Sequence, residues 1–304
     1  MSIAVFGSIN IDLVTYSDKL PRPGETLHGR RYAIGLGGKG CNQAVAVAKL
    51  GHPVNLIGRI GKDGFGNTAL SALKKHGVPA DGVLIDEGSD TGVAVIGVDA
   101  DAQNCITVIG GANMAVNGDD VERARAVFEA ADVLLLQLEI PLEAGLAAAD
   151  IVRATGGKVI FDPAPAPKDG LDPSVLARID VITPNETESE TLTGILPTNA
   201  DDAARAAEAL MAKGVSAAVI KLGAQGVFYK DATQSGFVRP FKVTSIDSVA
   251  AGDCFNGGLA YALADGKSLG DAVRFAAACG ALSTTKPGAS DSAPSLADVE
   301  HLLA

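Results

Sequence analysis

The strongest constraint on the fold is a regular alternation of apolar runs and helical patterns between residues 119 and 221. The apolar runs have the length of buried strands, and the segments between them carry apolar residues at helical spacing. The expected strands are 133–138, 158–161, 181–182 and 217–221, and the expected helices are 119–130, 141 onward, 185–192 and 199–213. Repeated strand–helix units predict an α/β fold, in which a doubly wound, mostly parallel sheet has helices on both faces.

The N-terminal part of the chain adds further strands. The same pattern predicts strands at 3–7 and 54–57 and helices at 41–50 and 63–76. Outside the alternation lie β-rich segments at 13–16, 27–34, 83–85, 91–98 and 105–109, with a turn at 99–104. These are extra strands that need a partner face. Neither a low-complexity linker nor an internal repeat divides the sequence, so we expect one domain over residues 1–304.

Charge and residue usage exclude several classes of protein. A net charge of -11 argues against nucleic acid or an anionic membrane as the main partner, although backbone amides and a metal ion can still bind a nucleotide. The sequence has no signal-peptide pattern and no apolar run near ~18 residues, so we expect a cytoplasmic protein. Its cysteines lack C-x-x-C spacing and its histidines do not cluster, which predicts reduced thiols and no transition-metal site. These residues are Cys41, Cys105, Cys254, Cys279, His28, His52, His76 and His301.

A segment near the C-terminal end carries the clearest chemistry. A β-branched, apolar stretch at 241–246 predicts a strand, and an alanine-rich helix is expected from 251 to 263. Small residues at the start of that helix leave backbone N–H groups uncovered, and with the helix dipole they predict an anion site. Asp253 lies where the anion would bind, which suits a group that takes a proton from an incoming hydroxyl. An N-cap role for Asp253 stays open, because Asp is a favoured N-cap residue.

Other polar side chains follow strands that should end at the same edge of the sheet. Asn10 and Asp12 come after the first strand, and Glu139 comes after the strand at 133–138. Ligands bind at this edge of open α/β sheets, so all three are candidate ligands. An Asx turn remains the alternative for Asn10 and Asp12, and a partner for a helix N-terminus remains the alternative for Glu139.

Two glycine-containing stretches are weak nucleotide-binding motifs. Residues 35–40 have dinucleotide-binding spacing, but they do not follow the first strand of a unit, and the next strand lacks the terminal acidic residue. A dehydrogenase is therefore a poorly supported alternative. Residues 266–268 have the tail of a P-loop, but Tyr261 stands where its first glycine must be.

The segment 247–258, Asp-Ser-Val-Ala-Ala-Gly-Asp-Cys-Phe-Asn-Gly-Gly, resembles the C-terminal signature D-T-x-G/A-A-G-D-x-F of the ribokinase-like (PfkB) carbohydrate kinases. Ser248 replaces the usual Thr, and Ala250 replaces the more general Gly. The segment 37–44, Gly-Gly-Lys-Gly-Cys-Asn-Gln-Ala, resembles the N-terminal signature of the same family. Further similar motifs are Gly-Ser-Ile-Asn-Ile-Asp12, Pro-Gly-Glu-Thr26, Gly-Ala-Asn113, Gln-Leu-Glu139, Asp162-Pro-Ala-Pro165 (where the pattern has Asn in place of Asp162) and Thr-Pro-Asn-Glu-Thr-Glu188. The resemblance runs from residue 3 to beyond residue 292.

The resemblance implies a fold, an activity and its cofactors. The implied fold is a ribokinase-like sheet sandwiched by helices, with a small β-sheet lid drawn from about 12–34 and 91–109 that covers the sugar and forms a homodimer surface. The implied activity is ATP-dependent phosphorylation of the primary hydroxyl of a pentose, first of all D-ribose at O5, with Mg²⁺ and K⁺. Kinases for deoxyribose, fructose, tagatose or nucleosides remain alternatives, as does a non-catalytic sugar-binding protein. Lid side chains near Val95, Ile106 and Val108 are expected to read the sugar.

The resemblance also implies individual residue roles. Asp253 is implied to be the catalytic base, with the backbone amides of Ala250, Ala251 and Gly252 forming the anion hole. The implied sugar ligands are Asn10, Asp12, Gly38, Lys39, Asn42, Glu139 and Asp253. The implied ATP and magnesium contacts are Asn185, Glu188, Lys221, Gly223, Gly226 and Gly252. The implied potassium ligands are Asp247, Val249, Ser283, Lys286, Gly288 and Ser292.

Several of these positions keep an alternative interpretation. Asn185 and Glu188 have the spacing of a capping box, and Lys39 is also compatible with a solvated loop lysine. Lys221 stands where ribokinase-like sequences usually have Thr; it either reaches a nucleotide phosphate or lies at the rim of the site. Ala277 stands where a larger polar residue often borders the adenine, so the contacts to the base stay open.

Overall fold

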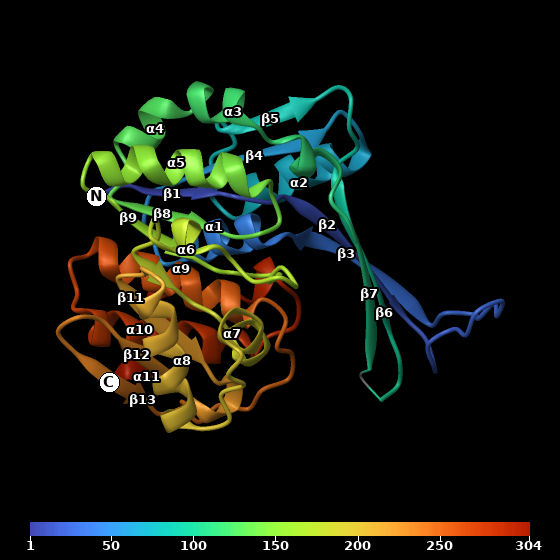
Figure 1. Cartoon of the computed structure of the whole chain (residues 1–304). Coiled ribbons are helices and arrows are strands. Elements are labelled where there is room, and N and C mark those ends of the chain that lie inside the picture. Colours follow the sequence, from blue (N-terminus) through green and yellow to red (C-terminus); the bar gives the residue numbers. More distant parts are fainter. Residues whose placement is uncertain (102) are drawn as a thin grey trace.

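The computed structural model describes residues 1–101 and 103–304, and the expected turn at 99–104 includes Ala102, which lies outside the described residues. The main element is a nine-stranded sheet of order β13-β12-β11-β10-β9-β8-β1-β4-β5 (Figure 1). All neighbouring pairs from β5 through β11 are parallel, and only β12 and β13 at one edge are antiparallel. The strands are β1 Ile3–Phe6, β4 Val54–Gly61, β5 Val83–Asp86, β8 Val133–Leu136, β9 Lys158–Phe161, β10 Val181–Ile182, β11 Ala217–Lys221, β12 Val227–Lys230 and β13 Ser235–Val238. The α/β prediction is confirmed.

Helices cover both faces of this sheet because the parallel strands are apolar on both sides. Along β1, Ile3 and Val5 pack into one core with α1, α2, α9, α10 and α11, whereas Ala4 and Phe6 pack into a second core with α3 to α8. The helices are α1 Lys39–Lys49, α2 Gly64–Lys75, α3 Gly118–Arg123, α4 Arg125–Glu129, α5 Leu142–Ala154, α6 Pro173–Leu176, α7 Glu186–Thr193, α8 Ala200–Ala212, α9 Ala251–Ala264, α10 Leu269–Ser283 and α11 Leu296–Leu303. Short 3₁₀ turns are Gly111–Ala115, Gly223–Gln225 and Ser290–Ser292. None of the described helices is long and apolar enough to cross a membrane.

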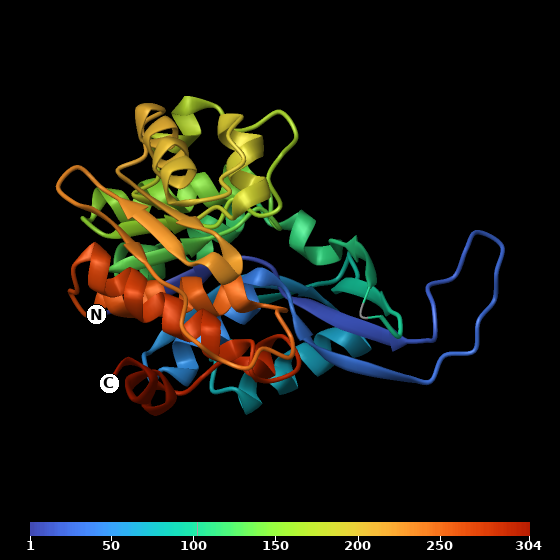
Figure 2. The ribbon, with the colours of Figure 1, turned by 90° about the horizontal axis from the view of Figure 1, so that it is seen from below.

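Four of the five extra β-rich segments form a separate four-stranded sheet of order β3-β2-β6-β7, called the lid sheet below, as the sequence predicts. The fifth segment, 83–85, is not one of these extra strands, because it lies in β5 and pairs in parallel with β4 at the edge of the main sheet. Its strands are β2 Asn10–Tyr16, β3 Arg31–Gly37, β6 Gly92–Val98 and β7 Asn104–Ile109. It extends from the layered body of the molecule, as Figures 1 and 2 show. Because β2 follows β1 after three residues, the base of the lid sheet lies at the carboxyl edge of the main sheet.

Three secondary-structure predictions differ from the structure. Residues 241–246 form no strand: Pro240 before them lacks an N–H for sheet pairing, and the amides of Ile246 and Asp247 donate instead to the carbonyl oxygen of Thr284. The expected helix at 119–130 is divided at Ala124 into α3 and α4. The strand expected at 27–34 lies at Arg31–Gly37, further along the chain.

The close approach of α1 and α9 depends on a glycine. A Cβ atom on Gly257 would lie 2.6 Å from the Cβ of Ala46 and 3.1 Å from the carbonyl oxygen of Gln43, both on α1. These distances are shorter than van der Waals contact, so only a residue without a side chain lets the helices pack at this separation. The N-terminal ends of both helices are thereby held together at the carboxyl edge of the sheet.

We expect Gly257→Ala to lower the free energy of unfolding by about 1–3 kcal/mol, because the added methyl group must push α9 away from α1. Chemical denaturation monitored by circular dichroism measures this change. Gly64→Ala is the matched control, since a Cβ there meets nothing within 4 Å. Equal stability of the two variants would show that the helix contact is not tightly packed.

Candidate active site

The site is assembled where several parallel strands end. Ser8 follows β1, Glu139 follows β8, Asp162 directly follows β9, and Lys221 is the last residue of β11. The N-termini of α1 and α9 meet the same edge. Parallel strands place their carboxyl ends together, so residues far apart in sequence become neighbours.

Asp253 is the buried carboxylate at the centre of this edge. It is 5% exposed, and its two oxygens accept hydrogen bonds from Asn42 Nδ2 at 3.0 Å and Gln43 Nε2 at 3.2 Å. The Lys39 ammonium lies 4.0 Å from Oδ1. Burial raises the pKa of Asp253 above its usual value; Lys39 and Asn42 oppose this rise, whereas Asp162 and Glu139 add to it. Asp253 therefore has an increased proton affinity and is held in place by side chains of α1.

Asp253 is not the N-cap of α9. The N-cap is Ala250, whose side chain makes no capping bond and whose φ of 58° lies in the left-handed region. Within the described chain, the N–H groups of Ala250, Gly252 and Asp253 have no protein acceptor, while that of Ala251 donates to the Ser248 carbonyl at 3.3 Å. The uncovered amides that the sequence predicts at the helix start are thus present, and they could accept an anion.

Asp162 is the second buried carboxylate, and it lies between two lysines. Its Oδ1 is 3.1 Å from Lys221 Nζ, and its Oδ2 is 3.4 Å from both Lys39 Nζ and Gln43 Nε2. Burial alone would raise the pKa of Asp162, but the two ammonium groups outweigh burial and hold the pKa below its usual value. Although burial acts to lower the pKa of Lys39, its acidic neighbours Asp162, Asp253 and Glu139 keep that pKa raised. Asp162 is therefore ionised at neutral pH.

The remaining predicted sugar ligands lie beside Lys39. The oxygen Glu139 Oε2 accepts from the Ser8 hydroxyl and, at 3.0 Å, from the Lys39 amide, so Glu139 caps the start of α1. Asn10 is buried and its Oδ1 accepts from Asn113 Nδ2 at 2.7 Å. Burial, followed by repulsion from Glu139 and Asp253, raises the pKa of Asp12 to about 6.

The structure settles some alternatives for these residues. Asn10 and Asp12 are in strand β2, not in an Asx turn. Gly38 has a φ of 88° at the N-cap of α1, and its ideal Cβ would lie 2.8 Å from the Asn10 amide nitrogen. Glu139 caps the start of α1, and its position also fits the role of a sugar ligand.

A cavity of about 380 Å³ adjoins the start of α9. Four of the predicted nucleotide contacts line this cavity: Lys221, Gly223, Gly226 and Gly252. Ala277, the position expected to border the adenine, lines it as well. The other lining residues are Ala224, Val227, Arg239, Pro240, Phe241, Val243, Ser245, Ser248, Ala251, Phe255, Gly280, Ala281 and Thr284. Phe241 and Val243, expected in a strand, thus form part of an apolar wall that suits a planar base.

Asn185 and Glu188 form the capping box that their spacing indicates. Asn185 Oδ1 accepts from the Glu188 amide at 2.9 Å, and Glu188 Oε2 accepts from the Asn185 amide at 2.8 Å. Burial raises the pKa of Glu188, Lys221 lowers it, and Asp162 adds to the rise. Both residues therefore lie near the charged edge without being among the residues that line the cavity.

The predicted potassium ligands come from two segments of the chain, 247–249 and 283–292. Asp247 accepts from the amides of Val249 at 3.0 Å and Gly288 at 2.9 Å. The Ser283 and Ser292 hydroxyls lie beside Cys254, whose pKa burial raises to about 12. The Lys286 side chain forms an ion pair with Asp298, with 3.7 Å between Nζ and Oδ2. Among the described residues, no three His, Cys, Asp or Glu side chains are arranged so that they could hold a metal ion.

Sequence reasoning missed several residues of the site. Gln43 bridges Asp162 and Asp253, and its Oε1 accepts from Gln137 Nε2 at 2.7 Å. Ser290 donates to Asn42 Oδ1 at 2.7 Å. Two features of the sequence could have indicated them. Gln43 lies just after the glycines at 37–40, and Asp162 directly follows the predicted strand at 158–161.

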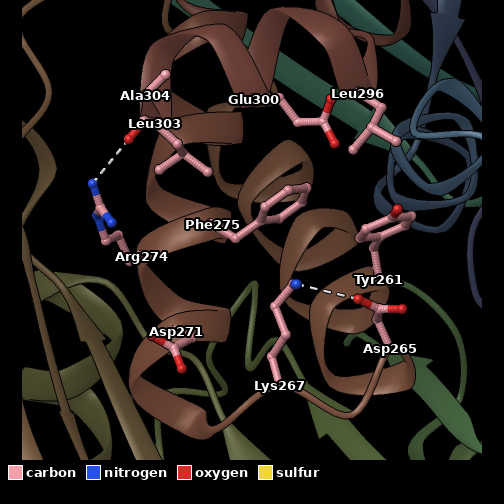
Figure 3. A pocket seen from close by; sticks show the side chains of 10 residues that line it. All are labelled: Tyr261, Asp265, Lys267, Asp271, Arg274, Phe275, Leu296, Glu300, Leu303 and Ala304. Atoms are coloured by element: carbon pink, nitrogen blue, oxygen red, sulfur yellow. Dashed lines mark hydrogen bonds and ion pairs between the residues drawn. The ribbon is translucent and has the colours of Figure 1, made fainter.

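A second cavity, of about 480 Å³, lies at the other end of α9 and carries no comparable arrangement (Figure 3). Tyr261 and Phe275 stack there with ring centroids 5.2 Å apart. The ammonium of Lys267 pairs with Asp265 at 3.2 Å, and Arg274 donates to the Leu303 carbonyl at 3.2 Å. Its charged groups are exposed and partly neutralise one another.

The chain matches known proteins over nearly its full length. Residues 1–296 match the model of the pfkB family carbohydrate kinases. The chain is 42% identical over 302 residues to a ribokinase of Haemophilus influenzae, covering 99% of this chain and 98% of that protein. It is 35% identical over 303 residues to a deoxyribokinase of Salmonella typhimurium, covering 100% and 99%. A solved Arabidopsis thaliana ribokinase, complexed with ribose and ATP, superposes with a TM-score of 0.91 at 33% identity, covering 99% and 98%.

We expect Asp12→Asn to remove a pH dependence of stability. Because the folded pKa of about 6 exceeds the reference 3.8, the folded state binds more protons between these values, and stability falls as pH rises through this window. The free energy of unfolding of the wild type relative to the variant should therefore fall by up to about 3 kcal/mol between pH 4 and pH 7.

Urea denaturation at a series of pH values measures this difference. Asp81→Asn, which changes an exposed carboxyl group in the turn before β5, serves as the control and should leave the pH dependence unchanged. A wild type and an Asp12→Asn variant with parallel pH profiles would contradict the raised pKa.

Proposed function

The chain belongs to the pfkB family of carbohydrate kinases, and on that premise we propose that it transfers the γ-phosphoryl group of ATP to the primary hydroxyl of a pentose, D-ribose at O5. The similarity to a Haemophilus influenzae ribokinase and to a ribokinase complexed with ribose and ATP supports this choice of substrates. Residues 1–304 would act as one kinase domain with the lid sheet over the sugar.

One observation carries the proposal: Asp253 lies between the predicted sugar ligands and the cavity at the start of α9. Its carboxylate faces Lys39, Asn42 and Gln43 of α1, beside the predicted sugar ligands. The adjacent Gly252 lines the cavity at the start of α9. An alcohol on one side and a phosphate on the other would therefore meet at this residue.

The geometry supports a direct transfer. Asn10, Asp12 and Glu139 would accept hydrogen bonds from sugar hydroxyls, and Lys39 and Asn42 would donate to sugar oxygens. Asp253 takes the proton of the attacking hydroxyl as its oxygen bonds to the γ-phosphorus and the bond from phosphorus to the bridging oxygen of ADP breaks. The amides of Ala250, Gly252 and Asp253 stabilise the charge on the transferred group. Asp253 then releases the proton to solvent.

Mg²⁺ and K⁺ would be held by the residues already named for them. The carboxylate of Glu188, oriented by the capping box and buried near Lys221, suits a water-mediated magnesium contact. Carbonyl oxygens of Val249, Ser283, Lys286 and Gly288, with Asp247 and the Ser292 hydroxyl, suit K⁺. Bound Mg²⁺ would neutralise phosphate charge during transfer.

A deoxypentose is the second candidate, because two relatives are named deoxyribokinase. The two substrates differ by one hydroxyl group, so the discriminating side chain must lie beside the sugar.

The register of the lid sheet shows which side chains share a face with Asp12. Asp12 pairs with Ala94, and Ala94 pairs with Val108. Ile106 lies two residues before Val108 on β7. Side chains alternate along a strand, so Ile106 and Val108 share the Asp12 face, whereas Val95 points to the opposite face. Of the side chains near Val95, Ala94 therefore lies on the Asp12 face, whereas that of Val95 itself does not.

A panel of sugars decides the substrate. We expect ADP release coupled to ribose phosphorylation to exceed that with deoxyribose, fructose, tagatose or a nucleoside, measured by kcat/KM with and without K⁺. Product analysis should place the phosphate on O5 of ribose. ADP release with none of these sugars would contradict a sugar kinase and favour a binding protein.

We expect Asp253→Asn to lower kcat by about 10²–10⁴-fold, because an amide cannot accept the hydroxyl proton. The KM for the sugar should change little, since Asn keeps the size of the side chain. Steady-state kinetics measures both constants, and Asp265→Asn, an exposed residue at the end of α9, is the control. An Asp253→Asn variant with normal kcat would rule out the base assignment.

We propose that the protein forms a homodimer through the lid sheet. Ile106 and Val108 are 53% and 55% exposed on one face of this sheet, an unusual place for two apolar side chains in an isolated chain. We expect Ile106→Ser/Val108→Ser to convert a dimer into a monomer in sedimentation velocity. Leu196→Ser changes a comparably exposed apolar residue (45%) between α7 and α8 and should leave the dimer intact. A monomeric wild type would exclude this interface.

A further inference from the structure

The ion pair between Lys221 and Asp162 joins two positions where the sequence departs from the family motifs quoted above. Asp162 stands in place of Asn, and Lys221 stands in place of Thr. In the structure, Lys221 Nζ lies 3.1 Å from Asp162 Oδ1, so a pair of neutral polar residues has become a pair of opposite charges. Each departure therefore compensates the other.

The pair is buried, which makes it dependent on both partners. The side chains are 14% and 1% exposed for Lys221 and Asp162. Removing one partner of such a pair leaves an uncompensated charge in a region of low dielectric. Lys221 is nevertheless the more accessible of the two, because it also lines the cavity at the start of α9.

The ammonium of Lys221 lies beside the free amides of α9. An ideal Cβ on Gly252 would be 3.5 Å from Lys221 Nζ. A phosphate that accepts hydrogen bonds from the Gly252 and Asp253 amides would therefore be within reach of the same ammonium. The phosphate and the Asp162 carboxylate compete for one cation.

Asp162 can release Lys221 without becoming an unpaired buried charge. Its other oxygen, Oδ2, lies 3.4 Å from both Lys39 Nζ and Gln43 Nε2, which stay in place on α1. Releasing Lys221 therefore costs free energy, because Asp162 loses one charge-assisted hydrogen bond. A ligand with several phosphate charges can meet that cost, whereas an uncharged nucleoside cannot recruit the lysine at all.

We propose that Lys221 is an exchangeable phosphate-binding cation that Asp162 holds in the free protein, and that this pair selects nucleoside di- and triphosphates over less charged ligands. Asp162 is a positioning residue in this arrangement, and it acts on the nucleotide chiefly by holding Lys221. The inference rests on the proposed kinase function, because it assumes that the cavity at α9 holds a nucleotide.

Binding of ADP and of adenosine to the full-length protein, without sugar, tests the proposal by calorimetry. Lys221→Thr should weaken ADP by at least about tenfold, the typical value of a hydrogen bond to a charged group, and leave adenosine unchanged. Asp162→Asn should change ADP affinity in the opposite direction, tightening it several-fold, because Lys221 no longer has to leave a carboxylate. A merely structural role for Asp162 would weaken both ligands.

The double variant Asp162→Asn/Lys221→Thr completes a double-mutant cycle and restores a neutral pair. Asp162→Asn should tighten ADP less in the Lys221→Thr background than in the wild type, because only the direct repulsion between the carboxylate and the phosphate is then removed. If Asp162→Asn alone does not fold, a double variant that binds ADP as tightly as the wild type would overturn the role of Lys221. Lys230→Thr/Glu208→Gln, which removes a more exposed ion pair of 2.7 Å between β12 and α8, should leave both affinities unchanged.

Weaker ADP binding in Asp162→Asn, or a tightening by Asp162→Asn that is as large without Lys221 as with it, would overturn the exchange. A wild type that binds neither ADP nor ATP would instead contradict the proposed kinase function. A wild type that binds ADP but phosphorylates no sugar would contradict the kinase function and leave the exchange to be judged from the variants.

Discussion

Buried negative charge at one edge of the main sheet is the constraint on which the site depends. Asp12, Glu139, Asp162 and Asp253 gather there, and the ammonium groups of Lys39 and Lys221 lie among them. A buried carboxylate is costly unless cations or hydrogen-bond donors compensate it. The compensation is unequal: Asp162 has two lysines, whereas Asp253 has one lysine at 4.0 Å and two amides. The two carboxyl pKa values therefore move apart, and Asp253 is the one with raised proton affinity.

The fold makes this concentration of charge possible because it collects chain segments that are distant in sequence. Parallel strands β1, β8, β9 and β11 end at one edge, and the starts of α1 and α9 complete it. Glycine allows the close contacts that this requires: a Cβ on Gly40 would lie 2.6 Å from the Gly7 carbonyl carbon, and Gly257 plays the same part between the helices. The charged site thus depends on contacts made by residues that have no side chains.

The sequence predicted the elements better than it predicted the side-chain contacts. Hydrophobic periodicity is a local property, so the α/β alternation and the extra strands could be read directly. The stretch 241–246 has strand composition, but a strand forms only where a neighbouring strand pairs with it. In the structure, the Ile246 amide donates to the Thr284 carbonyl instead. Gln43 and Asp162 were overlooked for the same reason. Their roles consist of contacts that span between 59 and 210 residues of sequence, and no local pattern records those contacts.

Local and functional interpretations of one residue are not always alternatives. Asn185 and Glu188 do form the capping box, yet the cap fixes the Glu188 carboxylate beside Lys221 and Asp162, where it can also act on a ligand. Asp253 shows the opposite outcome. It occupies the first turn of α9, where a capping role was open, but Ala250 is the N-cap and α1 holds the carboxylate. A carboxylate that stabilised its own helix would be occupied by backbone amides. Because Asp253 is not, both the carboxylate and the amides remain available, the first for an alcohol and the second for a phosphate.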